Sequence, residues 1–174
     1  KVYGKNIIEQ RKLSFDALSL EDAGAFAIVL ECVYAEAARA ITETLKIPTI
    51  GIGAGPFTSG QVLVIDDILG ISQFPQGKRP RFAQRFIDEG ENPYDTKVIT
   101  YAAHRFKEAV IRGEYPQRQH YFSLSGSAGV SSAIHRIKRY VSGSNKEWAV
   151  LPTKSRQRRH MLSDSMNKNS SPVD

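Results

Sequence analysis

A single carboxylate ends a short apolar run early in the chain. Glu31 follows the apolar residues 26–30 and precedes Cys32 and Val33. Burying an unpaired carboxylate is costly, so such a group must be paired, protonated or functional. Apolar surroundings disfavour its ionised form, which suits a general acid or base that works near neutral pH. The alternative is a carboxylate that only stabilises the N-terminus of a following helix, and the spacing alone leaves both interpretations open.

Three glycines follow the next apolar run, at positions 51, 53 and 55. A dinucleotide site would need the spacing G-x-G-x-x-G and a helix that begins at once. Here the spacing is G-x-G-x-G, and Pro56 and a loop follow. The pattern therefore favours a tight turn whose backbone passes close to a neighbour or a ligand, and a nucleotide loop is not predicted.

Two further groups of residues could in principle hold a metal ion. Asp66 and Asp67 follow a third apolar run, residues 61–65, where paired carboxylates could bind a divalent cation. Aspartate more often caps the turn that follows, and this is the favoured interpretation. The four histidines share no metal-ligand spacing: His104, His120, His135 and His160. We expect the first on a helix surface and the others in loops or in the tail.

The composition indicates one folded domain followed by a basic tail. The chain has 174 residues, 41% of them apolar, which is enough for one domain with a core. Its net charge of +6 comes mostly from the C-terminal end. No run approaches the roughly 18 consecutive apolar residues of a membrane-spanning helix, so no membrane partner is expected. The lone cysteine, Cys32, leaves no internal disulfide and fits a reducing compartment.

A first helix is predicted over residues 6–23. Asn6 is a suitable N-cap, Glu9 has the spacing of a capping box, and Gly24 follows the last turn. The periodicity predicts an apolar face toward the core. That face consists of Ile8, Phe15 and Leu18, broadened by Leu13, Ala17 and Leu20.

Strands are predicted over residues 26–30, 49–52 and 61–65, each apolar and so covered on both faces. A helix over residues 34–46 joins the first two strands. Its expected core residues are Ala37 or Ala38, Ile41 and Leu45, and its expected water-facing residues are Glu36, Arg39 and Glu43.

Two more helices are predicted before the pattern weakens. The first covers residues 78–89, with Phe82 and Phe86 one turn apart, and the second covers residues 95–112. Residues 117–174 are basic and then rich in Ser and Asn, and we expect them to be largely disordered. Few aromatic residues accompany these charges, so nucleic acid is not the expected partner.

The alternation of strands and helices favours an α/β fold with a parallel sheet. Only three strands are predicted, whereas a closed (β/α)₈ barrel needs eight strands and roughly 250 residues. The chain is therefore either a small open sheet or the back part of a barrel. In both cases a site is expected at the carboxyl ends of the strands.

Four motifs, in order, resemble the ketopantoate (3-methyl-2-oxobutanoate) hydroxymethyltransferase family. They are FAIVLECV at residues 26–33, IPTIGIGAGP at 47–56, GQVLV at 60–64 and DILG at 67–70. The opening residues 1–5 and residues 20–26 match as well. The resemblance covers residues 1–116 and implies strands six to eight and the closing helices of a TIM barrel of the phosphoenolpyruvate/pyruvate type. Residues 117–174 would be a separate extension.

The resemblance also implies a reaction. The family transfers a one-carbon unit from 5,10-methylenetetrahydrofolate to α-ketoisovalerate, with Mg²⁺, and so makes ketopantoate for pantothenate and coenzyme A. Glu31 matches the family's proton-accepting glutamate. The Mg²⁺ ligands are implied to lie in the family's first half, which this chain does not match, and no folate-binding residue is assigned.

The resemblance implies large homo-oligomers that act on small molecules. Any targeting peptide would precede Lys1, so the expected compartment is the cytoplasm or the mitochondrion. Because the chain would hold the base without the metal site, we expect it to be inactive alone. The alternative is a non-catalytic, truncated paralogue that associates with full-length subunits through its exposed strand edge.

Overall fold

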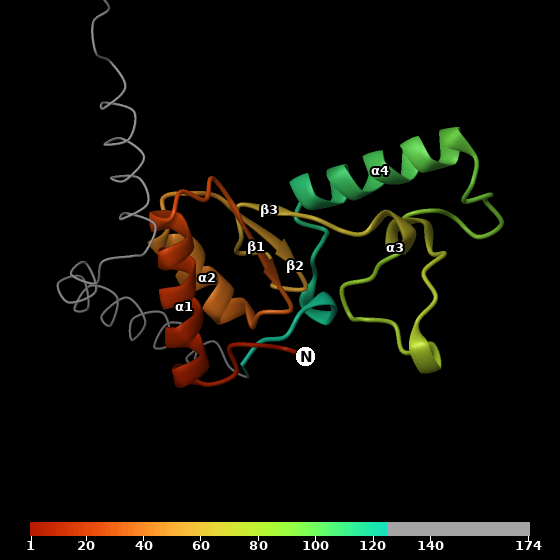
Figure 1. Cartoon of the computed structure of the whole chain (residues 1–174). Helices are drawn as coiled ribbons and strands as arrows, with labels where there is room; N and C mark the ends of the chain where they lie inside the picture. Colours follow the sequence, from red (N-terminus) through yellow and green to blue (C-terminus); the bar gives the residue numbers. More distant parts are fainter. Residues whose placement is uncertain (125–174) are drawn as a thin grey trace, which may run out of the picture. The chain divides into compact units, whose positions relative to one another are not determined.

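The computed structural model describes residues 1–124 (Figure 1). Its sheet has three parallel strands in the order β1 (Ile28–Glu31), β2 (Thr49–Ile52) and β3 (Gly60–Gln61). A parallel bridge between Tyr3 and Val33 places the first residues of the chain alongside the segment that continues β1. The predicted α/β class with a small parallel sheet is confirmed.

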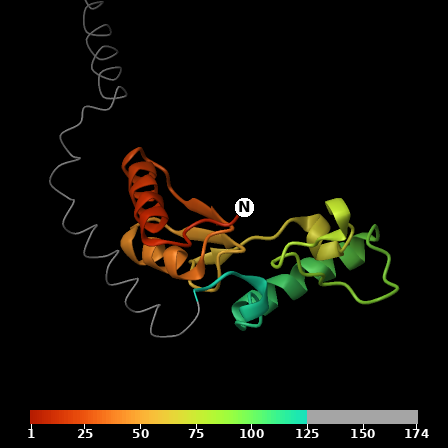
Figure 2. The ribbon, with the colours of Figure 1, turned by 90° about the horizontal axis from the view of Figure 1, so that it is seen from below.

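The described residues form four α-helices: α1 (Ile7–Asp22), α2 (Ala35–Thr44), α3 (Ile65–Leu69) and α4 (Thr96–Ile111). Two short 3₁₀ turns complete the described part, η1 (Pro75–Gly77) and η2 (Arg118–His120). Figures 1 and 2 show α1 and α2 side by side on one face of the sheet. Within residues 1–124, no helix is long and apolar enough to cross a membrane.

The ends of α1 follow the local sequence signals. The Asn6 side chain accepts a hydrogen bond from the Glu9 amide at 3.0 Å, as an N-cap does. The Glu9 carboxylate accepts hydrogen bonds from the amides of Gly4 and Lys5, at 2.9 and 3.1 Å. In a standard capping box this carboxylate would accept from the amide of the N-cap residue itself, here Asn6. Gly24 has a φ of +96°, which ends the helix as predicted.

The face that α1 turns to the core differs from the predicted one. Three of the predicted core residues are largely exposed: Ile8, Phe15 and Leu20. The buried residues are Gln10, Ser14 and Ala17, of which Ala17 was predicted, and the predicted Leu13 is partly buried against the same core. Gln10 Nε2 donates to the Gly4 carbonyl and Ser14 Oγ to the Gln10 carbonyl, each at 2.9 Å, so neither polar side chain is buried without a partner. The predicted face is therefore right for Ala17 and in part for Leu13, and wrong for Ile8, Phe15 and Leu20.

One face of β1 is open in the described part of the chain. Ile28 and Leu30 are buried with Ile41 of α2, whereas Val29 between them is 61% exposed. Phe26, predicted to begin the strand, is 89% exposed and precedes it. Within residues 1–124, the expected cover on both faces is therefore wrong for β1, whereas no residue of β2 is exposed.

The predicted third strand ends after two residues. The Val62 amide still donates to the Gly51 carbonyl at 3.0 Å, but α3 begins at Ile65. β2 ends at Ile52 and the chain turns at Gly53, so no backbone remains beside residues 63–65 to continue the ladder. Asp66 and Asp67 consequently lie in the first turn of α3 and not at a strand end.

The predicted helix over residues 78–89 is absent from the structure, which has an irregular loop there. The Phe86 amide, which a helix would bond to the carbonyl four residues earlier, donates instead to the Ile68 carbonyl of α3 at 2.8 Å. α4 follows within one residue of its predicted bounds, with Asp95 as its N-cap. Phe86 then packs in a core cluster with Ile52, Leu63, Ile68, Leu69, Ile87, Ala102, Ala109 and Tyr115.

Of the segment expected to be largely disordered, residues 117–174, the structure describes only residues 117–124. His135 and His160 lie outside the described residues. His104 is exposed on α4, as predicted, and His120 belongs to η2. The predicted domain limit at residue 116 remains a prediction.

Candidate active site

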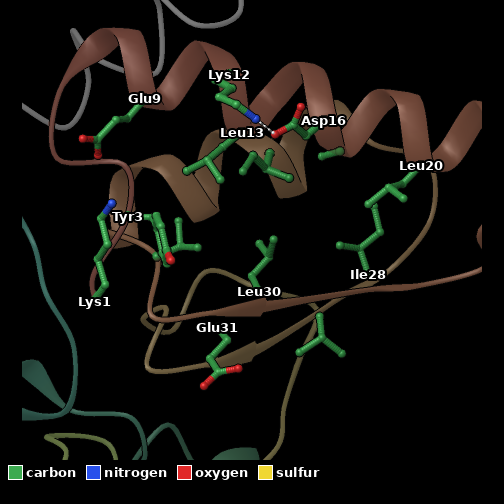
Figure 3. Close-up of a pocket in the computed structure, with 14 residues that line it drawn as sticks. Lys1, Tyr3, Glu9, Lys12, Leu13, Asp16, Leu20, Ile28, Leu30 and Glu31 are labelled. Atoms are coloured by element: carbon green, nitrogen blue, oxygen red, sulfur yellow. Dashed lines mark hydrogen bonds and ion pairs between the residues drawn. The ribbon is translucent and has the colours of Figure 1, made fainter.

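Glu31 lies at the carboxyl end of β1, beside the end of β2. The parallel register pairs Glu31 with Ile52, and the Cys32 amide donates to the Ile52 carbonyl at 2.9 Å. Side chains alternate along a strand, so Glu31 shares the face of Val29 and lies opposite Leu30. Figure 3 shows this directly: Leu30 points toward the helices, and the Glu31 carboxylate points to the other side of the strand.

The Glu31 carboxylate is exposed and accepts no hydrogen bond from the described residues. The expectation of a buried carboxylate is therefore wrong, because nothing in residues 1–124 covers that face of β1. An ionised carboxylate without a partner at a strand end is available to take a proton from a molecule bound there. Glu31 does not cap the following helix, since α2 begins at Ala35 with Tyr34 as its N-cap.

Cys32 directs the chain sharply away from the strand after Glu31. Its φ of +52° is the one positive φ of a non-glycine residue among residues 1–124. Burial raises the pKa of its thiol, and the nearby Glu31 charge raises it further. A thiol held in its protonated form is a poor nucleophile, so Cys32 is not a candidate catalytic group.

The glycine turn after β2 packs against two neighbours. Gly53 has a φ of +64°, and a Cβ there would lie 2.5 Å from the Phe82 ring. Gly55 has a φ of +83°, and a Cβ there would lie 2.7 Å from that of Ala35, at the start of α2. The prediction of a tight turn with close neighbours is confirmed.

An open cavity of about 550 Å³ lies between α1 and the free edge of β1 (Figure 3). Its apolar lining includes Leu13, Leu20, Ile28, Leu30, Val33 and Ile41. Charged residues, among them Lys1, Glu9 and the ion pair of Lys12 with Asp16, stand at its rim. The cavity is thus an apolar packing surface along an unpaired strand edge, and Glu31 borders it with its carboxylate turned away from α1.

Glu36, predicted to face water, is instead 1% exposed. One carboxylate oxygen accepts hydrogen bonds from the Ser123 hydroxyl and from the Leu124 amide, the latter at 3.1 Å. The Ala35 amide donates to the Phe122 carbonyl at 2.9 Å, so residues 121–124 run over the first turn of α2. Helical periodicity could not find this contact, because its partners are 87 and 88 residues away along the chain.

Replacing Glu36 with alanine should detach residues 121–124 from α2. The partly buried Leu124 amide would lose its acceptor, which costs up to about 1–3 kcal/mol of folding free energy. Urea unfolding and hydrogen exchange of the Leu124 amide measure the two effects. Glu43→Ala is the control on the same helix, because Glu43 forms an exposed ion pair with Arg39 and its loss should cost about 0.3–0.5 kcal/mol. Equal losses in the two variants would show that Glu36 does not anchor the segment.

His120 makes the same segment sensitive to acid. Its Nδ1 accepts a hydrogen bond from the Gln117 amide at 3.0 Å, and burial lowers the pKa of its imidazole. A pKa lower in the folded than in the unfolded chain means that stability is intact above about pH 6.5, the unfolded value. Stability is then lost as the pH falls through the folded value.

The acid-sensitivity is tested by urea unfolding between pH 7.5 and pH 5. The wild-type chain should lose stability toward pH 5, and His120→Gln should flatten this dependence while His104→Gln, at an exposed position on α4, should not. If the two variants give the same pH profile, His120 is not the responsible group.

Among residues 1–124, no group of three or more His, Cys, Asp or Glu side chains could hold a metal ion. Asp67 is buried and accepts a hydrogen bond from the Ser72 hydroxyl, which closes the turn after α3. The described residues therefore do not fit a Mg²⁺ site, and no chemical step of this chain is assigned to a metal.

Comparison with known proteins identifies relatives over this region. A family model described as ketopantoate hydroxymethyltransferase matches residues 1–118. A 3-methyl-2-oxobutanoate hydroxymethyltransferase of Ignicoccus hospitalis is 48% identical over 122 residues, 70% of this chain and 43% of that protein. A protein of the same name from Syntrophomonas wolfei is 42% identical over 124 residues, 71% of this chain and 42% of that protein.

A plant protein is similar to the same degree. Arabidopsis thaliana 3-methyl-2-oxobutanoate hydroxymethyltransferase 1, mitochondrial, is 44% identical over 119 residues, 67% of this chain and 33% of that protein. The chain spans less than half the length of these three relatives. The match nevertheless includes all of β1, the glycine turn and α4. The chain therefore belongs to the ketopantoate hydroxymethyltransferase family.

Proposed function

We propose that this chain is the part of a 3-methyl-2-oxobutanoate hydroxymethyltransferase that supplies the proton acceptor of the reaction, Glu31. The observation that carries the proposal is the position of this carboxylate. It stands exposed, with no hydrogen-bond or ion-pair partner among residues 1–124, at the carboxyl end of a parallel strand, on the face opposite α1 and α2. Sites of parallel α/β folds are built at such strand ends.

The proposed reaction begins with loss of a proton from C3 of α-ketoisovalerate. Glu31 accepts that proton, and the electron pair of the broken C–H bond forms a carbon–carbon bond with the methylene carbon of 5,10-methylenetetrahydrofolate as the first of that carbon's two bonds to nitrogen breaks. The released nitrogen takes up the proton that Glu31 accepted. Water then gives its hydroxyl group to the methylene carbon as the second carbon–nitrogen bond breaks, and the second nitrogen takes the remaining proton of the water, which gives ketopantoate and tetrahydrofolate. A carboxylate is a suitable base only where the carbonyl beside C3 stabilises the resulting enolate. The complete enzyme must therefore also contain groups that bind this carbonyl.

In this proposal β1, β2 and β3 are strands six to eight of a (β/α)₈ barrel. The parallel bridge of Tyr3 to Val33 supports it, because the chain before Tyr3 would continue as a strand beside β1. The barrel part would cover residues 1–116 and residues 117–174 would form a separate extension. Mg²⁺ would be held by residues that this chain does not contain, and this chain alone would be inactive.

Mixing two parts tests the proposal. The chain is coexpressed with the portion of the Syntrophomonas wolfei relative that it does not match, and ketopantoate formation is measured with Mg²⁺, α-ketoisovalerate and 5,10-methylenetetrahydrofolate. We expect turnover by the reconstituted pair and by neither part alone. Turnover by the chain alone would contradict the incomplete site, and a stable but inactive pair would contradict the proposed function.

A non-catalytic partner subunit is the second candidate. The free edge of β1 and the apolar cavity of about 550 Å³ beside it favour this alternative, because unpaired edges recruit further chains. Cosedimentation of this chain with a complete relative separates the candidates. A catalytic part completes an unfinished barrel and should not bind a finished one, whereas the partner subunit should.

A further inference from the structure

A basic loop, residues 78–85, lies beside the ends of the strands. It contains four cations and no acidic residue: Lys78, Arg79, Arg81 and Arg85. All four side chains are exposed. Concentrated charge of one sign raises the local concentration of ions of the opposite sign. The loop is therefore a candidate binding site for an anion.

Two contacts hold this loop at the glycine turn after β2. The Phe82 ring covers Gly53 so closely that a Cβ on that glycine would lie 2.5 Å from the ring. The Tyr115 hydroxyl donates to the Phe82 carbonyl at 2.8 Å, which fixes the loop backbone from the other side. The loop thus keeps a defined position against the carboxyl end of β2.

A third contact connects the loop to the end of β1. The Arg81 guanidinium lies 4.6 Å from the centre of the Phe122 ring. Phe122 in turn packs near Tyr34, with ring centres 6.1 Å apart, and accepts a hydrogen bond from the Ala35 amide. Tyr34 and Ala35 lead from the Glu31 end of β1 into α2, so these contacts place Arg81 near the same end of β1 as the proposed proton acceptor.

Two arginines of this loop, Arg79 and Arg81, have no carboxylate partner among the described residues. Arg79 stacks over Phe74 and Arg81 over Phe122, and neither forms an ion pair with a carboxylate among residues 1–124. Three other arginines of the described chain do have carboxylate partners: Arg39, Arg105 and Arg112. A guanidinium stacked on a ring is held in place, yet the N–H groups at its edge stay available to a carboxylate.

We propose that residues 78–85 bind the glutamyl tail of the folate co-substrate, with Arg79 and Arg81 as the principal contacts. This inference rests on the proposed function. The tail carries one free carboxylate for each glutamate and a further one at its end, and the fork of a guanidinium matches a carboxylate in two hydrogen bonds. The one-carbon unit sits at the opposite end of folate, on the pterin side. A tail held at this loop leaves that end free to approach the strand ends that carry Glu31.

Binding of pteroyl compounds to the full 174-residue chain tests the tail site. Equilibrium dialysis compares pteroic acid, which has no tail, with pteroylmonoglutamate and pteroyltriglutamate. The wild-type chain should bind the triglutamate about tenfold more tightly than pteroic acid, and this preference should weaken with added salt. The double variant Arg79→Gln with Arg81→Gln should lose most of the preference.

Arg112→Gln is the matched control, because Arg112 is an exposed arginine whose partner is Glu108. It should keep the full preference, and circular dichroism should show the same folded content in all variants. The proposal is overturned if the double variant keeps the preference, if no pteroyl compound binds, or if a short RNA binds through the two arginines more tightly than the triglutamate.

The outcomes separate this site from the proposed function. If the reconstituted pair forms no ketopantoate while the arginine-dependent preference persists, the proposed function fails and the tail site stands. If ketopantoate forms but the preference does not depend on the two arginines, the tail site is wrong and the proposed function stands.

Discussion

Replacing Glu31 with glutamine should lower ketopantoate formation by the reconstituted pair about 10²–10⁴-fold, the usual contribution of a general base. Glutamine keeps the length and shape of the side chain but cannot accept the proton from C3 of the keto acid. The exposed position of Glu31 leaves its neighbours without a hydrogen bond to lose, so folding should not change. Steady-state kinetics should show the loss in kcat, with little change in the KM for α-ketoisovalerate.

Glu89→Gln provides the control for that measurement. Glu89 is an exposed glutamate in the loop before α4, and its replacement removes the same charge from the chain. We expect it to leave kcat unchanged. If the reconstituted pair that carries Glu31→Gln keeps its kcat, Glu31 is not the base. If both variants lose kcat equally, the loss comes from the change in net charge and not from a missing base.

Gly53→Ala should be among the most destabilising single-methyl changes in the described chain. Its φ of +64° disfavours any side chain by about 1–2 kcal/mol, and the added Cβ would lie 2.5 Å from the Phe82 ring. Such an overlap costs about 1–3 kcal/mol more where the ring cannot move away. The Tyr115 hydroxyl holds the Phe82 backbone, which limits that movement.

Gly113→Ala separates the two contributions. Gly113 follows α4 with a φ of +70°, close to that of Gly53, but no atom lies within 4 Å of its added Cβ. The free energy of unfolding, measured in urea, should fall by about 1–2 kcal/mol in Gly113→Ala and by about 2–5 kcal/mol in Gly53→Ala. If both variants lose the same free energy of unfolding, the Phe82 ring does not pack closely against Gly53. The basic loop would then lack the main contact that holds it in a fixed position.

Features that depend on neighbouring residues were predictable from the sequence. The N-caps Asn6 and Asp95 act within three residues of their own positions, and the structure has both. β2 has its predicted bounds because Pro48 and the glycine turn limit it from either side. The glycine turn itself was predictable as a close approach, although the sequence could not name Phe82 and Ala35 as the neighbours.

Features that depend on distant parts of the chain were not predictable. Glu36 has the spacing of a solvent-facing helix residue, and only residues 123 and 124 make it a buried anchor. The apolar residues 62–65 do not form a strand, because β2 ends before it could pair with them. Phe82 and Phe86 have helical spacing, yet the Phe86 amide is bound to α3.

Glu31 combines both kinds of feature. Its type and its place after an apolar run mark it as a candidate from the sequence alone. Its exposure follows from the absence of cover over Val29 within the described residues, which no local pattern reveals. Among residues 1–124, no cluster of three or more metal-ligating side chains accompanies this candidate base.

Exchange of the C3 proton tests the central claim most directly. α-Ketoisovalerate is incubated in D₂O with Mg²⁺ and without folate, and deuterium at C3 is followed by proton NMR. The account predicts exchange with the reconstituted pair, and no exchange above the uncatalysed rate with the relative's portion alone or with a pair that carries Glu31→Gln. Exchange at an undiminished rate by the relative's portion alone would place the base outside this chain and would contradict the account.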